Sequence, residues 1–94
     1  MILSLKEKNA VICGSTQGIG LAVAKELALL GANCILLARN EVSLQQAVSL
    51  LDVSQGQQHE YAVADFSNTQ QVKAAIEKIV QTTTVHVLIN NTGG

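Results

Sequence analysis

Three glycines directly follow the first apolar run of this chain, and their spacing restricts the fold more than any other feature. Gly14, Gly18 and Gly20 come after Ala10 to Cys13, and an amphipathic stretch begins where they end. Such a turn between a buried strand and a helix is typical of dinucleotide-binding α/β proteins. The first glycine permits the tight turn, the second lets the backbone approach a pyrophosphate, and the third lets the helix pack closely on the strands. The alternative is a tight turn that binds nothing, while the absence of Lys-Ser or Lys-Thr after Gly20 excludes a P-loop.

The rest of the chain alternates short apolar runs with longer stretches of helical periodicity, which is how a parallel sheet covered by helices is encoded. The apolar runs predict four strands, at residues 10–13, 34–38, 61–64 and 85–89. The third run is the shortest and least apolar of them, so we expect it nearer an edge of the sheet. Helices are expected from Gly18 to about Leu30, after a cap at Asn40, and after a capping box formed by Ser67 and Gln70. Gly31 is expected to terminate the first helix in a left-handed conformation.

Each predicted helix has an apolar stripe that defines its expected buried face. In the first helix the stripe consists of Ile19, Val23, Leu27 and Leu30. In the second it consists of Leu44, Ala47, Val48 and Leu51. In the third it consists of Val72, Ile76, Ile79 and Val80.

These elements predict the α/β class and a Rossmann-type, doubly wound parallel sheet of which only the N-terminal portion, β-α-β-α-β-α-β, is present. Right-handed crossovers give the strand order third, second, first, fourth, with a nucleotide above the carboxyl ends of the two central strands. The sequence stops at Gly94, directly after a predicted strand, where such a sheet normally continues. We therefore expect residues 1–94 to be the N-terminal NAD(P)-binding portion of a longer single-domain protein.

Composition excludes several other classes of function. A net charge of -1 provides no electrostatic field for nucleic acid or for an anionic membrane. The chain has neither an apolar run long enough to span a bilayer nor a secretory signal, so we expect a cytoplasmic protein. Cys13 and Cys34 are expected to be core thiols on neighbouring strands, too far apart for a disulfide. His59 and His86 are expected to be structural, and no metal site is predicted.

Two motifs resemble those of the short-chain dehydrogenases/reductases. Residues 13–20, Cys-Gly-Ser-Thr-Gln-Gly-Ile-Gly, are similar to the family's Thr-Gly-x-x-x-Gly-x-Gly motif, and residues 90–93, Asn-Asn-Thr-Gly, to its Asn-Asn-Ala-Gly motif. Cys13 replaces the usual Thr, and Thr92 replaces the usual Ala beside the expected cofactor ribose. The resemblance covers essentially the whole chain but only about the first third of a typical member. It implies homo-oligomers for the full-length protein.

The residues after the second strand indicate the cofactor. NAD-binding sites place an Asp or Glu there to bind the ribose 2′-hydroxyl, but this chain has Ala38, Arg39 and Asn40. The guanidinium suits a 2′-phosphate, which favours NADP(H) over NAD(H), although Glu41 lies nearby and Arg39 could also be a solvated loop charge. Asp65 could be a charge favoured by a helix N-terminus, whereas the resemblance implies that it binds the adenine amino group.

Taken together, these considerations predict a cofactor site and no catalytic residue. The expected cofactor-binding residues are Gly14, Ser15, Thr16, Gly18, Ile19, Gly20, Arg39, Asn40, Asp65, Phe66, Asn91, Thr92 and Gly93, with Asn90 as the structural residue of its motif. The resemblance implies catalysis by Ser, Tyr and Lys in a Tyr-x-x-x-Lys arrangement. Tyr61 is the only Tyr and has Asp65, not Lys, four residues later, so the 94 residues alone are expected to be inactive.

The primary hypothesis is thus the cofactor-binding part of an NADP(H)-dependent oxidoreductase that acts on a small carbonyl or alcohol substrate. The motif sequences look most like the 3-oxoacyl-acyl-carrier-protein reductase branch of the family. The alternatives are a non-catalytic nucleotide-binding or subunit-assembly module, and a regulator that senses NADP(H).

Overall fold

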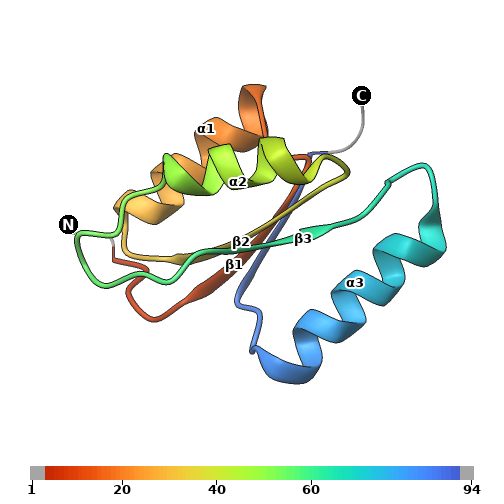
Figure 1. Cartoon of the computed structure of the whole chain (residues 1–94). Helices are drawn as coiled ribbons and strands as arrows, with labels where there is room; N and C mark the ends of the chain where they lie inside the picture. Colours follow the sequence, from red (N-terminus) through yellow and green to blue (C-terminus); the bar gives the residue numbers. More distant parts are fainter. Residues whose placement is uncertain (1–3, 92–94) are drawn as a thin grey trace.

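The computed structural model describes residues 4–91 and confirms the predicted alternation of strands and helices. In chain order the elements are β1 (Asn9–Cys13), α1 (Gly18–Leu29), β2 (Asn33–Ala38), α2 (Glu41–Ser49), β3 (Glu60–Val63), α3 (Thr69–Thr82) and β4 (Val87–Asn90). The strands form one parallel sheet in the order β3-β2-β1-β4, as expected from right-handed crossovers. Helices α1 and α2 cover one face and α3 covers the other, so the sheet is doubly wound (Figure 1).

The strand register brings the carboxyl ends of the central strands together. Cys13, the last residue of β1, is aligned with Leu37 in β2 and with Asn90 in β4. Because neighbouring residues of a strand point to opposite faces, β1 contributes Ala10 and Ile12 to the core under α1 and α2, and Val11 and Cys13 to the core under α3. Because the carboxyl ends of β1, β2 and β4 are in register, the loops that follow these strands lie close together at the carboxyl end of the sheet.

Helix α1 contacts the sheet through a face that matches the predicted one only in part: Leu27 of the predicted stripe packs against the core. The predicted stripe contained Ile19, yet this side chain is 71% exposed, and the fully buried positions are Gly20, Ala24 and Ala28. These small residues recur every four positions and allow the helix backbone to lie close to the strands. The prediction missed the buried positions because Gly and Ala contribute little to an apolar pattern, although they are the buried residues of this helix. The predicted face of α2 is confirmed, with Leu44 and Ala47 both buried.

The start of α3 also differs from the prediction. Asn68, not Ser67, caps this helix, because its Oδ1 accepts hydrogen bonds from the backbone N–H groups of Gln70 and Gln71 at 3.1 and 3.3 Å. Ser67 instead donates its hydroxyl to Asp65 Oδ1 at 2.7 Å, so this hydroxyl is used within the preceding turn. Val80 was expected on the apolar stripe but is 53% exposed.

Both edges of the sheet are formed by short strands. The edge position of β3 confirms the prediction, and the strand begins one residue earlier than expected. Strand β4 begins only at Val87, so His86 precedes the strand, whereas we expected it inside. Its Nδ1 accepts a hydrogen bond from the Asn9 N–H at 3.0 Å. Leu88, on the face of β4 toward α3, is 58% exposed.

The two cysteines are free and buried, as predicted. Cys34 pairs with Ala10, and Cys13 pairs with Leu37, so the two thiols lie three positions apart along neighbouring strands. Burial raises the pKa of both thiols, that of Cys34 to about 11. Within residues 4–91, no helix is long and apolar enough to cross a membrane.

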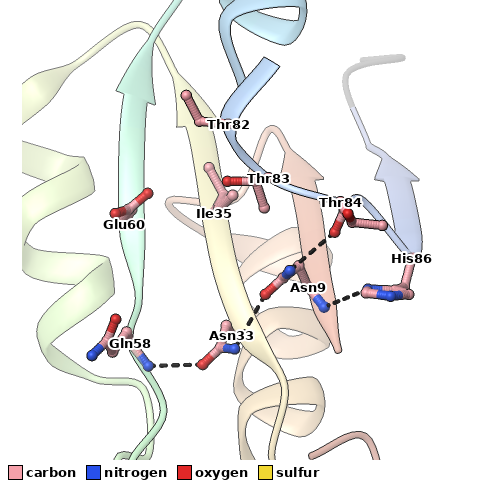
Figure 2. Close-up of a pocket in the computed structure, with 9 residues that line it drawn as sticks. All are labelled: Asn9, Asn33, Ile35, Gln58, Glu60, Thr82, Thr83, Thr84 and His86. Atoms are coloured by element: carbon pink, nitrogen blue, oxygen red, sulfur yellow. Dashed lines mark hydrogen bonds between the residues drawn. The ribbon is translucent and has the colours of Figure 1, made fainter. Parts of the chain in front are cut away.

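A cluster of side-chain amides joins the amino ends of the strands, next to a cavity of about 430 Å³ (Figure 2). Asn33 Nδ2 donates to Asn9 Oδ1 at 3.1 Å, and Asn9 Nδ2 donates to the Thr84 carbonyl at 3.0 Å. The Gln58 N–H donates to Asn33 Oδ1 at 2.8 Å. This cluster links β1 and β2 to the segments that lead into β3 and β4, and so it stabilises the register of the whole sheet.

Candidate functional site

The loops at the carboxyl edge of the sheet surround a pocket of about 820 Å³. Its lining comprises Gly14, Thr16, Gln17, Gly18, Ile19, Ala38, Arg39, Asn40, Ser43, Asp65, Phe66, Ser67 and Asn91. Nine residues of the predicted cofactor site are in this set: Gly14, Thr16, Gly18, Ile19, Arg39, Asn40, Asp65, Phe66 and Asn91. Of the others, Ser15 and Gly20 are buried and do not line the pocket, and Thr92 and Gly93 fall outside the described residues.

The glycine loop has the geometry that the spacing predicts. Gly14 and Gly18 have φ angles of 72° and 60°, values that favour glycine. A Cβ added to Gly20 would collide with the Gly14 carbonyl oxygen and lie 3.1 Å from the Ser15 Cα, so a hydrogen is required for α1 to pack on the loop. A Cβ on Gly18 would meet nothing within 4 Å, which shows that the space beside this residue is open.

The N-terminus of α1 faces this loop without a side-chain cap. Gln17 occupies the cap position but accepts no hydrogen bond there, whereas Asn40 caps α2 and Asn68 caps α3. The first turn of α1 also contains no acidic residue. Uncapped N–H groups and the positive end of the helix dipole favour an anion at this position.

Ser15 is placed differently from the other residues of the loop. It is fully buried, and its Oγ has no hydrogen-bond partner among the described residues. A buried hydroxyl without a partner costs about 1–3 kcal/mol. Ser15 is not among the residues that line the pocket.

The charged side chains of the pocket are Arg39, at the end of β2, and Asp65, after β3. Arg39 is exposed, and its guanidinium makes no hydrogen bond or ion pair within residues 4–91. Asp65 Oδ1 accepts hydrogen bonds from the Ser67 hydroxyl and N–H at 2.7 and 2.9 Å. These bonds, together with the positive charge of Arg39, lower the pKa of Asp65 below its usual value. Asp65 is therefore an ionised acceptor at neutral pH.

Ser43 lines the pocket, but the sequence did not single it out. It lies in the first turn of α2, where its N–H donates to Asn40 Oδ1 at 2.9 Å. Its position could have been inferred, because a helix capped by Asn40 places its third residue beside the end of β2. The hydroxyl of Ser43 is thus a further polar group near Arg39.

The second predicted motif lies beside the glycine loop. The Asn91 N–H donates to the Cys13 carbonyl at 3.1 Å, which joins the ends of β4 and β1. Asn90 ends β4 and lines a separate cavity of about 340 Å³ together with Cys13 and Leu88.

Tyr61, which the sequence excluded as a catalytic acid, does not line the pocket that contains the glycine loop. No cluster of three or more potential metal ligands occurs in the part of the chain that is described.

Comparison with known proteins identifies the family. Residues 8–94 match the family model described as short chain dehydrogenase. The chain belongs to the short-chain dehydrogenase family. The match includes both the glycine loop and residues 90–93, so it covers both of the sequence motifs.

The relatives of this short-chain dehydrogenase chain include one protein that is named as inactive and others that are named as reductases. It is 38% identical over 84 residues to human inactive hydroxysteroid dehydrogenase-like protein 1, covering 89% of this chain and 26% of that protein. It is 32% identical over 90 residues to the 3-oxoacyl-acyl-carrier-protein reductase of Chlamydia trachomatis, covering 95% of this chain and 36% of the reductase.

Among solved structures, the L-sorbose reductase of Gluconobacter frateurii, complexed with NADPH and L-sorbose, is similar with a TM-score of 0.88 and 33% identity. The alignment covers all of this chain and 36% of the reductase. This chain therefore spans between about a quarter and about a third of the length of these relatives.

Proposed function

We propose that this chain is the NADP(H)-binding part of an oxidoreductase that transfers a hydride between its cofactor and a small carbonyl or alcohol substrate. The observation that carries the proposal is that one pocket contains both the glycine loop and Arg39, whose guanidinium has no ion pair among the described residues. The pocket volume of about 820 Å³ lies within the usual range for pockets that bind small molecules and cofactors.

The pocket residues fit a dinucleotide that carries an additional phosphate. The uncapped turn of α1 would bind the pyrophosphate through backbone N–H groups, and the open space at Gly18 would allow close approach. Arg39 would bind the 2′-phosphate with its planar set of donors, and Ser43 could add a hydroxyl. The ionised carboxylate of Asp65 would accept a hydrogen bond from the adenine amino group. When bound, the cofactor supplies or accepts the hydride.

The catalytic step belongs, in this proposal, to sequence beyond residue 94. Residues 1–94 then form the first part of a longer single domain, in keeping with the share of each relative that they match. The reductases among the relatives favour carbonyl reduction, and the Chlamydia trachomatis protein makes a 3-oxoacyl thioester the first substrate to test. An assay of the natural-length protein with NADPH and 3-oxoacyl substrates would examine this directly.

The cofactor assignment is tested by replacing Arg39 with Ala. Losing hydrogen bonds to a charged group costs about 1.5–3 kcal/mol, so NADPH should bind about tenfold to a hundredfold more weakly, while NADH binding stays nearly unchanged. Lys25→Ala is the matched control, because Lys25 is an exposed cation on α1 outside the pocket. Equal losses for both cofactors, or no loss in Arg39→Ala, would show that Arg39 does not bind the 2′-phosphate.

A second candidate is a nucleotide-binding protein without catalytic activity. It is favoured by the similarity to a human protein whose name describes it as inactive. The two functions differ in one feature of the natural-length protein, the presence of a Tyr-x-x-x-Lys sequence after residue 94. Cofactor binding without this sequence, and without turnover of any carbonyl substrate, would support the non-catalytic function.

A further inference from the structure

Glu41 poses a question for a site that is proposed to bind an additional phosphate. It lies two residues after Arg39 and begins α2, so a carboxylate occurs close in sequence to the proposed phosphate ligand. An acid near the end of the second strand ordinarily favours the ribose hydroxyls of NAD(H) and would repel a 2′-phosphate. Glu41 is nevertheless absent from the lining of the pocket, whereas Arg39, Asn40 and Ser43 are all present.

Tyr61 explains where the carboxylate lies. Its hydroxyl donates to Glu41 Oε2 at 3.4 Å and accepts a hydrogen bond from Gln45 Nε2 at 3.1 Å. Glu41 and Gln45 are one helical turn apart, so the phenol oxygen contacts two neighbouring side chains on the same face of α2. The Glu41 carboxylate thus points toward β3, the edge strand that carries Tyr61.

The phenol ring holds this hydroxyl in place. Tyr61 is half-buried and packs against the core cluster between the sheet and the helices α1 and α2. Tyr has only two side-chain torsions, so a packed ring leaves its hydroxyl little freedom. Glu41, by contrast, is an exposed and flexible side chain whose position depends on the partners available to it.

We propose that Tyr61 is a positioning residue for cofactor preference, which holds the Glu41 carboxylate on the β3 side of α2 and so leaves Arg39 free for the 2′-phosphate of NADP(H). Without the Tyr61 hydroxyl, the carboxylate can turn toward Arg39 and compete with the phosphate for its guanidinium. This inference rests on the function proposed above. It adds to that function a residue outside the pocket that acts through another side chain.

The expected effect is modest, because the hydrogen bond is long and exposed. Interactions between exposed charges contribute about 0.2–1 kcal/mol. At about 1.4 kcal/mol per tenfold change, NADPH affinity should fall about 1.4- to fivefold when the carboxylate is released. NADH lacks the phosphate, so its affinity should stay the same or increase slightly.

The test compares Tyr61→Phe with the wild type in the protein at its natural length, by titration of NADPH and NADH followed through the fluorescence of the nicotinamide. Phe keeps the packed ring and removes only the hydroxyl. The expected result is a fall of about 1.4- to fivefold in the ratio of NADPH to NADH affinity. Gln45→Ala is the matched control, because Tyr61 can still donate to Glu41, and its ratio should equal that of the wild type.

The second half of the test repeats the substitution in a Glu41→Gln background, where there is no charge to position. Tyr61→Phe should then leave the ratio unchanged, a result that a general loss of packing would not produce. An unchanged ratio in Tyr61→Phe alone, or an equal fall in the Glu41→Gln background, overturns the inference. If the wild-type protein shows no preference for NADPH, the proposed cofactor and this inference both fail. If Arg39→Ala lowers the preference for NADPH but Tyr61→Phe leaves it unchanged, only this inference fails.

Discussion

Replacing Gly20 with Ala should damage both stability and cofactor binding, because this position joins α1 to the glycine loop. The new methyl group would overlap the Gly14 carbonyl oxygen and lie 3.0 Å from the Gly14 carbonyl carbon and 3.1 Å from the Ser15 Cα. All three are backbone atoms, so no side chain can move aside, and α1 must shift away from the loop.

The size of the effect follows from two opposing contributions. Forcing a methyl into a packed contact costs about 1–3 kcal/mol or somewhat more. Ala is a better helix former than Gly by about 1 kcal/mol, which offsets part of that cost. The difference is a net loss of about 0–2 kcal/mol in the free energy of unfolding, and the overlap with backbone atoms places Gly20→Ala toward the upper end of this range. NADPH affinity should fall as well, because the shift displaces the N–H groups of the α1 N-terminus.

The assay is urea unfolding of the natural-length protein, combined with NADPH titration at a urea concentration where every variant is folded. Gly56→Ala is the matched control, since Gly56 has a φ of 84° and no atom within 4 Å of an added Cβ. This variant should lose about 1–2 kcal/mol from backbone strain alone and bind NADPH normally. A Gly20→Ala protein with wild-type stability and wild-type affinity would refute the close packing of α1 on the loop.

Three further predictions concern the cap of α3, the pKa of Asp65 and the buried thiol of Cys34. Asn68→Ala should lower the free energy of unfolding by about 1 kcal/mol in urea titrations, as expected for a lost helix cap, and Ser67→Ala should lower it by less. A larger loss in Ser67→Ala than in Asn68→Ala would show that Ser67 is the cap. Ser67→Ala should instead raise the pKa of Asp65 in an NMR titration, because the hydroxyl bond that lowers it is gone. The lowered pKa means that ionised Asp65 stabilises the fold above its unfolded pKa and loses this effect as the pH falls through the folded value, so Ser67→Ala should reduce the acid sensitivity of stability. At pH 8, Cys34, with a pKa of about 11, should react with a thiol reagent only as the protein unfolds, and labelling of the native protein at the rate of a free thiol would contradict its burial.

The sequence predicted the order of the elements and most of the pocket, because these depend on strong local signals. Continuous apolar runs such as that of β2 occur where both faces of a strand are covered, and they mark the centre of the sheet. Gly14 and Gly18 have the positive φ angles expected of a phosphate-binding turn, and Gly31 ends α1 with a φ of 100°, as predicted.

The features that the sequence missed depend on competition between neighbouring groups. Ser67 and Asn68 are both good helix caps, and only the geometry of the turn decides that Ser67 bonds to Asp65. The buried face of α1 consists of Gly and Ala, which hydrophobicity patterns rank below Ile19. Tyr61 on β3 contacts Glu41 and Gln45 on α2, so its surroundings exist only after the chain has folded.

The amide cluster at the amino ends of the strands has a consequence at the opposite edge of the sheet. A strand of given length has a fixed span, so anchoring its first residue decides which residue emerges at its last position. If β4 slipped by one residue against β1, Asn91 would move by about 3.3 Å, and Leu88 would turn from one face of the sheet to the other. Asn9 forms hydrogen bonds with Thr84 and His86, just before β4. These bonds set the register of β4 and so determine which residue lies at its carboxyl end. Substitutions of Asn9 should therefore alter the pocket that is proposed to bind the cofactor, although Asn9 lies at the other end of the strands and does not line this pocket.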